Sequence, residues 1–274
     1  MLVKIDNNVK RISHKIALPY LNTHRQAKVS VIIPALNEAE NLPYVLPRIP
    51  SWVYEVILVD GHSTDSTINV AQQLWPNIRV IVQEGRGKGA ALRTGCTAAT
   101  GDIVVMLDAD GSTDPEEIPL FCALLAHADF VKGSRFLQGA ETADMPLYRR
   151  WGNRGFVLLT NLLFGTRYTD ITYGYNATWR YNLAYLALDI DGWASEIISN
   201  IRAVRHGLHV VEVPSFEYER IAGKAKLSTL SAGWAILKAI VREYFRELRE
   251  PKPELFLEKV NFTEGCTTVE GNEA

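Results

Sequence analysis

Five short apolar runs recur through the first half of the chain and place the strongest constraint on its fold. They are KVSVIIP (28–34), EVILVD (55–60), RVIVQ (79–83), IVVMLD (103–108) and DFVKGS (129–134). Near-continuous runs of Val and Ile are typical of strands buried on both faces of a parallel sheet. Helix-length segments separate the runs. The alternation predicts an α/β fold, Rossmann-like and doubly wound, with a mostly parallel sheet and helices on both faces.

Two of the separating segments carry helix-start signals. In STDSTINVAQQL, Ser63 or Thr64 is a plausible N-cap, and in STDPEEIPLFCALL, Pro115 falls in the first turn of the predicted helix. Further along, we expect a helix near 194–206, a last strand at 209–214 and an amphipathic helix over 229–248.

The overall composition is that of an ordinary globular protein. The formal net charge of −2 gives no general attraction for nucleic acid, and none is expected as a partner. Three cysteines without metal-ligand spacing indicate a reducing, cytoplasmic location. The most apolar stretch, 155–165, is far shorter than the ~20 residues that span a bilayer.

The character of the sequence changes after the fifth apolar run. We expect an N-terminal extension over 1–27, one α/β half over 28–135 and a second half over 136–250, with both halves in one continuous domain. The tail over 251–274 has little periodicity and is predicted to be disordered.

Polar residues follow the predicted strands where each one ends. Because ligands of open α/β sheets bind beyond the carboxyl ends of the strands, these residues are candidate site residues. Asp108 and Asp110 form a D-x-D pair, and strand alternation would turn both toward one point. Two carboxylates so close are stabilised by a cation between them, and hard divalent ions prefer oxygen ligands.

The loop GRGKG (85–89) follows the third predicted strand. It matches neither a P-loop nor a dinucleotide-binding glycine motif. Arg86 and Lys88 would instead meet phosphate oxygens at the N-terminus of a helix, which also favours anions.

The chain resembles the family-2 nucleotide-sugar glycosyltransferases of the GT-A fold in four sequence motifs. They are VSVIIPALNEAENL, VILVDGHSTDST, GRGKGAALRTG and VMLDADGSTDP. The resemblance implies a UDP- or GDP-sugar donor, with Mg²⁺ or Mn²⁺ held by Asp108 and Asp110. Family members usually carry Asp-Asp-Gly-Ser after the second strand, and here Gly61 and His62 follow Asp60. The nucleotide-sugar-binding residues it implies are Pro34, Ala35, Asn37, Glu38, Asp60, Gly87, Lys88, Asp108, Ala109 and Asp110.

The second half is similar to a narrower group, the dolichol- or polyprenyl-phosphate hexose synthases. The shared motifs are GSR (133–135), a basic segment at 149–150, NLLFGTRYTDITYGY and RIAGKAKLS. The resemblance implies a polyprenyl phosphate acceptor and an inverting displacement. The acceptor-phosphate residues would be Arg135, Arg149, Arg150, Arg220 and Lys226, of which Arg220 and Lys226 would also assist catalysis together with Asp110.

A phosphate acceptor has a second pKa of ~6 and is an anion at neutral pH, so its transferase needs no strong base. A hydroxyl acceptor needs one. Glu196 and then Asp170 are the candidate bases for this alternative. Less favoured alternatives are nucleotidyl transfer from a nucleoside triphosphate and a non-catalytic nucleotide-sugar binding module.

Apolar residues at 3-and-4 spacing form one stripe along the predicted helix 229–248. A stripe of this kind packs most often on the protein's own core or on a second subunit, which would make a homodimer. The alternative is a peripheral contact with the cytoplasmic membrane face. The stripe comprises Leu230, Trp234, Leu237, Val241, Tyr244 and Leu248.

Overall fold

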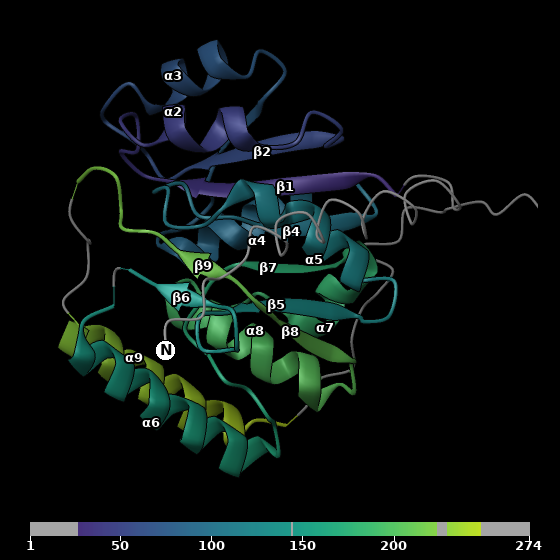
Figure 1. Cartoon of the computed structure of the whole chain (residues 1–274), viewed down its shortest axis with the longest axis vertical. Coiled ribbons are helices and arrows are strands. Elements are labelled where there is room, and N and C mark those ends of the chain that lie inside the picture. Colours follow the sequence, from purple (N-terminus) through teal and green to yellow (C-terminus); the bar gives the residue numbers. More distant parts are fainter. Residues whose placement is uncertain (1–26, 144, 224–228, 248–274) are drawn as a thin grey trace, which may run out of the picture.

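The structure, a computed structural model, describes residues 27–143, 145–223 and 229–247. Its centre is a seven-stranded sheet with the order β3-β2-β1-β4-β7-β5-β8 (Figure 1). All strand pairs are parallel except those that β7 makes with β4 and β5. The predicted α/β fold with a mostly parallel sheet is confirmed. The strands are β1 (Val29–Ala35), β2 (Glu55–Asp60), β3 (Arg79–Val82), β4 (Ile103–Met106), β5 (Phe130–Ser134), β7 (Asn176–Trp179) and β8 (Val210–Pro214).

Helices cover both faces of the sheet. In β1, Val31 and Ile33 join the apolar cluster on one face and Ile32 joins the cluster on the other, and all three are fully buried. This explains the unbroken apolar runs, because neither face of a central strand meets water. The helices are α2 (Leu42–Val45), α3 (Thr67–Leu74), α4 (Lys88–Ala98), α5 (Ile118–Leu124), α6 (Leu147–Phe164), α7 (Leu183–Leu186), α8 (Ala194–Arg205) and α9 (Thr229–Tyr244).

The predicted start of α3 at Ser63 or Thr64 is wrong, because the helix begins at Thr67. Ser63 and Thr64 are instead tied to the loop after β1: Ser63 Oγ accepts from the Asn37 amide, and Asn37 Oδ1 accepts from the Thr64 amide. The start near Pro115 is confirmed: a 3-10 turn over Pro115–Glu117 runs directly into α5, and Asp114 caps it by accepting from the Glu116 amide.

Several elements of the second half were not predicted, among them β7 and α6. β7 lies in the sheet between β4 and β5, so both halves of the chain contribute to one sheet. α6 runs for 18 residues to Phe164, and Gly165 in the left-handed region caps its C-terminus. It lies beside α9 at one edge of the molecule, against α8 (Figure 1). A short second sheet pairs β6 (Glu141–Thr142) with β9 (Phe216–Glu217).

Candidate active site at the carboxyl ends of the strands

The carboxyl ends of the central strands open into a cavity of about 1650 Å³. Its lining includes Asp108, Ala109 and Asp110 together with residues of α6 and α9. β4 ends at Met106, so strand alternation does not orient the D-x-D pair as predicted; both carboxylates lie in the turn after the strand and still line the cavity.

Lys88, the first residue of α4, lies between two carboxylates. Its Nζ is 2.5 Å from Asp108 Oδ1 and 2.9 Å from Glu196 Oε1. Burial by itself lowers the pKa of Lys88, but the two carboxylates outweigh it and raise this pKa above its ordinary value. Burial raises the pKa of Glu196, against the effect of Lys88. The GRGKG loop therefore places a fixed cation beside the D-x-D pair.

Arg220 forms the equivalent contact with the second carboxylate. Its Nη2 is 3.0 Å from Asp110 Oδ2, and its Nη1 is 3.0 Å from Glu38 Oε2. Glu38 belongs to the loop after β1 and is buried. Each carboxylate of the D-x-D pair is thus paired with a different cation, brought from α4 and from the segment after β9.

The amides at the start of α4 are partly occupied. Gly87, with φ of 89°, is the N-cap, and the Gly89 and Ala90 amides in the first turn donate to the Asp191 carbonyl. Arg86, Gly87 and Lys88 line the cavity. The side chains of Arg86 and Lys88 are therefore the main groups that this loop offers to an anion.

The predicted nucleoside pocket is assembled in part. Pro34, Ala35 and Glu38 line the cavity. Asp60 is 3% exposed; its Oδ2 accepts from the Ser63 amide, and its Oδ1 accepts no hydrogen bond from the described residues. Asn37, with φ of 51°, is outside the lining and binds Thr64. Asp60 is not part of the cavity lining either, so its Oδ1 is a buried acceptor without a donor beside the pocket.

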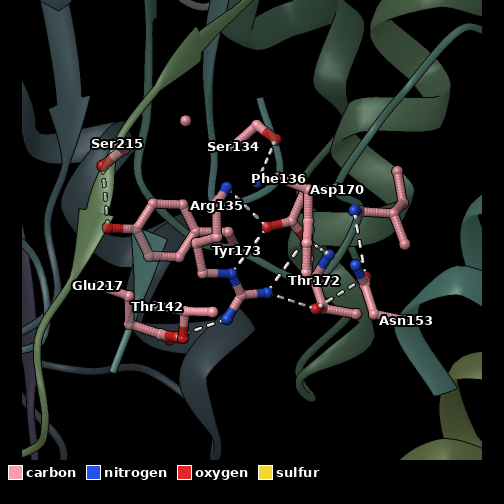
Figure 2. A network of polar contacts seen from close by, with 12 residues as sticks. Ser134, Arg135, Phe136, Thr142, Asn153, Asp170, Thr172, Tyr173, Ser215 and Glu217 are labelled. Atoms are coloured by element: carbon pink, nitrogen blue, oxygen red, sulfur yellow. Dashed lines mark hydrogen bonds and ion pairs between the residues drawn. The ribbon is translucent and has the colours of Figure 1, made fainter. Parts of the chain in front are cut away.

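Arg135 and Asp170 lie together at the end of β5 (Figure 2). Arg135 donates to Asp170 through Nε and Nη2, to Glu217 through Nη1 and to Thr172 Oγ1 through Nη2. Burial raises the pKa of Asp170, but Arg135 and Lys132 outweigh it and lower the pKa to about 2. Arg135 borders the cavity with its guanidinium engaged, and the fully buried Asp170 does not line it.

The remaining basic candidates are placed differently from one another. Arg149 lines the cavity from α6. Arg150 is not part of the lining and donates to the Met145 and Thr142 carbonyls. Lys226 lies outside the described residues. The structure therefore brings Arg149 and Arg220 to the cavity but not Arg150.

Several polar or aromatic residues in and around the site were not predicted from the sequence, among them Asn153, Trp193 and Asn41. Asn153 is buried and lines the cavity; its Oδ1 accepts from Thr172 Oγ1, while its Nδ2 has no partner among the described residues. Trp193 lines the cavity with its ring 5.4 Å from Lys88 Nζ. Asn41 contacts both Glu38 and Ala222. Asn153 follows Arg149 by one helical turn, a signal that is visible only when α6 is assigned as a helix.

The described residues of the predicted stripe do not form the buried face of α9. Trp234, Val241 and Tyr244 are exposed, while Ile240 and Glu243 form the buried face, where Glu243 pairs with Arg202 of α8. Leu237 lines the cavity, and the Leu230 and Leu248 side chains lie outside the described residues. We call the exposed residues of this edge the α6/α9 apolar face: Leu147, Trp151, Leu158, Leu162, Trp234, Val241 and Phe245.

No helix within the described ranges is long and apolar enough to cross a bilayer.

The described residues contain no group of three or more His, Cys, Asp or Glu side chains that could hold a metal ion. Asp108 and Asp110 offer hard oxygen ligands of the kind that Mg²⁺ and Mn²⁺ accept, and they fit an ion whose other ligands come from phosphate and water.

Comparison with known proteins agrees with this fold and site. The Glycosyl transferase family 2 model matches residues 30–184. The undecaprenyl-phosphate mannosyltransferase of Micrococcus luteus is 33% identical over 223 residues, which is 77% of this chain and 91% of that protein. The dolichyl-phosphate hexose transferase of Haloferax volcanii is 34% identical over 228 residues, 80% of this chain and 95% of that protein.

A solved structure shares the fold. The glucosyl-3-phosphoglycerate synthase from Mycobacterium tuberculosis, in complex with Mn²⁺, uridine diphosphate and phosphoglyceric acid, has a TM-score of 0.66 and 21% sequence identity, covering 86% of this chain and 83% of that one. The match to the family over more than half of the chain, together with these relatives, shows that the chain belongs to glycosyl transferase family 2 and is a glycosyltransferase.

Proposed function

We propose that this chain transfers a hexose from a UDP- or GDP-sugar to a polyprenyl phosphate, with inversion at the anomeric carbon. One observation carries the proposal: a single cavity joins the charged region at Asp108 and Asp110 to an apolar region between α6 and α9. A donor diphosphate suits the first region and an isoprenoid chain the second. The names of the two family relatives, a polyprenyl-phosphate and a dolichyl-phosphate transferase, support the same acceptor class.

The donor would bind along the ends of β1, β2 and β4. Asp60 Oδ1 would accept an N–H from the base, which both uracil and guanine offer. Lys88 and Arg220 would bind the diphosphate, since each already lies beside a carboxylate of the D-x-D pair. Fixed cations at this place stabilise the charge that develops on the departing nucleoside diphosphate.

Asp108 and Asp110 would hold Mg²⁺ or Mn²⁺ together with oxygens of the donor diphosphate. The metal would supply further charge neutralisation on the leaving group. Because each carboxylate is paired with Lys88 or Arg220, the diphosphate would have to attract these cations before the carboxylates could serve as ligands.

The acceptor phosphate would bind near Arg149 and Asn153. Both line the cavity, and Asn153 Nδ2 is a buried donor without a partner among the described residues. Arg135 would hold this region in place, since its guanidinium is engaged by Asp170, Glu217 and Thr172. An ionised phosphate attacks without a protein base. Transfer to it is therefore compatible with Glu196 and Asp170 being engaged in ion pairs with Lys88 and Arg135.

The lipid chain would run between α6 and α9, past Phe156, Ile236 and Leu237. The α6/α9 apolar face lies beside this groove and would rest on the membrane surface, with Arg154, Lys238 and Arg242 near anionic headgroups. Such a peripheral contact would bring the cavity to a lipid acceptor.

The test is a transfer assay with radiolabelled UDP-glucose and GDP-mannose. Each donor is incubated with and without a short polyprenyl phosphate, with Mg²⁺, Mn²⁺ or EDTA, and the products are extracted into organic solvent. We expect label in the organic phase only with the lipid and a divalent metal present. Metal-dependent release of UDP or GDP without an extractable product would contradict the lipid acceptor and favour a soluble hydroxyl acceptor, for which Glu196 lines the cavity as a base.

A further inference from the structure

The segment from Tyr218 to Gly223, which we call the Arg220 segment, lies across the D-x-D turn. The Tyr218 amide donates to the Ser112 carbonyl at 2.9 Å, and the Ile221 amide donates to the Asp110 carbonyl at 3.3 Å. Gly111 has φ of 81°, and a side chain there would collide with Ile221. The D-x-D turn is thus shaped to accept this segment.

Asn41, in the loop after β1, makes a third attachment to the Arg220 segment. Asn41 Oδ1 accepts from the Ala222 amide at 2.8 Å, and Asn41 Nδ2 donates to the Ala222 carbonyl at 3.3 Å. The same Nδ2 donates to Glu38 Oε2 at 2.5 Å. Asn41 is 2% exposed, so it holds these partners in a place that excludes water.

A side chain that hydrogen-bonds both the amide and the carbonyl of Ala222 must carry an acceptor and a donor. A carboxamide provides both, whereas a carboxylate lacks the donor and an alanine lacks both. Asn41 also fixes Glu38, which shares Arg220 with Asp110. Asn41 therefore acts on Arg220 in two ways: through the backbone two residues away, and through the carboxylate that binds its guanidinium.

We infer that Asn41 is a positioning residue that latches the Arg220 segment over the D-x-D pair and so determines where the Arg220 guanidinium stands. The hydrogen bonds of the Asn41 side chain go to Glu38 and Ala222 rather than to the D-x-D carboxylates, and its effect on the reaction passes through Arg220. The inference rests on the proposed role of Arg220 at the donor diphosphate. Orientation errors of small size at such a group lower rates strongly, which gives a remote latch a measurable effect.

A double-mutant cycle tests this inference in sugar transfer. Arg220→Ala is expected to lower kcat by about 10²-fold, as removal of one charge-stabilising group does. Asn41→Ala should lower kcat by about 10-fold, equivalent to one or two hydrogen bonds, with a change in donor KM below about 3-fold. The double variant should match Arg220→Ala alone, because a latch has no effect once the side chain it positions is gone.

Glu40→Gln is the matched control, since Glu40 is exposed and lies in the same loop one residue before Asn41. It should retain wild-type kcat. If the losses of Asn41→Ala and Arg220→Ala multiply in the double variant, Asn41 acts independently of Arg220 and the inference is wrong. It is equally wrong if Asn41→Ala is as active as Glu40→Gln.

Tryptic cleavage of the Arg220–Ile221 bond gives a readout that needs no substrate. We expect about 10-fold faster cleavage in Asn41→Ala than in the wild type, because the segment opens more often. Equal cleavage rates would overturn the latch. If Asn41→Ala does not fold, the nearly isosteric Asn41→Asp removes the Nδ2 donor and decides the same question. A wild-type chain that makes no lipid-linked sugar would refute the proposed acceptor but leave this comparison intact.

Discussion

Lys88 Nζ lies 2.5 Å from Asp108 Oδ1 and 2.9 Å from Glu196 Oε1, so one buried cation joins the D-x-D pair to the first turn of α8. Gly174 makes this contact feasible, because a side chain at that position would collide with the Glu196 carboxylate. Glu196 therefore neutralises and orients Lys88 in the described structure, a role distinct from that of a base.

Glu196→Gln separates these two roles. With a polyprenyl phosphate acceptor, we expect kcat to fall by less than about 10-fold, since Gln can still hold Lys88 but no proton needs to be removed. A general base would account for about 10²- to 10⁴-fold. The measurement is kcat over pH 6–9, with Asp108→Asn as the variant that should lose nearly all turnover. A loss of 10²-fold or more in Glu196→Gln would favour a hydroxyl acceptor.

Arg135 and Arg149 should differ in what their removal affects. Arg135→Met leaves the buried Asp170 carboxylate without its main partner, and we expect it to lower the free energy of unfolding by about 3–5 kcal/mol. Arg149→Met removes a cation that lines the cavity, and should raise the acceptor KM about 10-fold with unfolding unchanged. Urea unfolding and acceptor titration measure the two effects. Equal stability of the two variants would contradict the structural role of Arg135.

The α6/α9 apolar face should bind membranes. A Leu158→Glu/Leu162→Glu variant is expected to sediment with anionic phosphatidylglycerol vesicles at least about 10-fold less than the wild type, because it places charge where apolar surface would be buried. Its thermal unfolding should be unchanged, since both side chains are exposed. Trp52→Glu, an exposed apolar residue in the segment before β2, is the matched control and should bind like the wild type. Undiminished binding of the double variant would exclude this face as the membrane contact.

Glu117 predicts a pH dependence of stability. Burial raises the pKa of Glu117 to about 7 from an ordinary value of 4.5, although Ser215 Oγ and the Phe216 amide donate to it. The folded state therefore binds the proton more tightly, and stability falls as pH rises from about 4.5 to 7, by at most about 3 kcal/mol. Glu117→Gln should lose less stability over this range in urea titrations. A parallel pH dependence of the two proteins would contradict the prediction.

Local sequence was sufficient for the first half of the fold and for much of the site. Buried parallel strands need unbroken apolar runs, so β1, β2, β3, β4 and β5 were each visible, and topology then brings their carboxyl ends to one edge. Asp108, Asp110 and Lys88 could be placed together on this basis, because each follows a strand that is predicted from its apolar run.

The second half depended on tertiary structure. β7 is a four-residue strand, Asn-Ala-Thr-Trp, that is stabilised by antiparallel pairing with both β4 and β5 and has no apolar run of its own. Without β7 and α6, the sequence could not distinguish Arg149, which lines the cavity, from Arg150, which binds two backbone carbonyls. Sequence therefore determined the strands and the charged groups at their ends, since these follow from local burial. Which cation faces which carboxylate was decided by contacts between residues far apart in the chain, as in the pairing of Arg220 with Asp110 and Glu38.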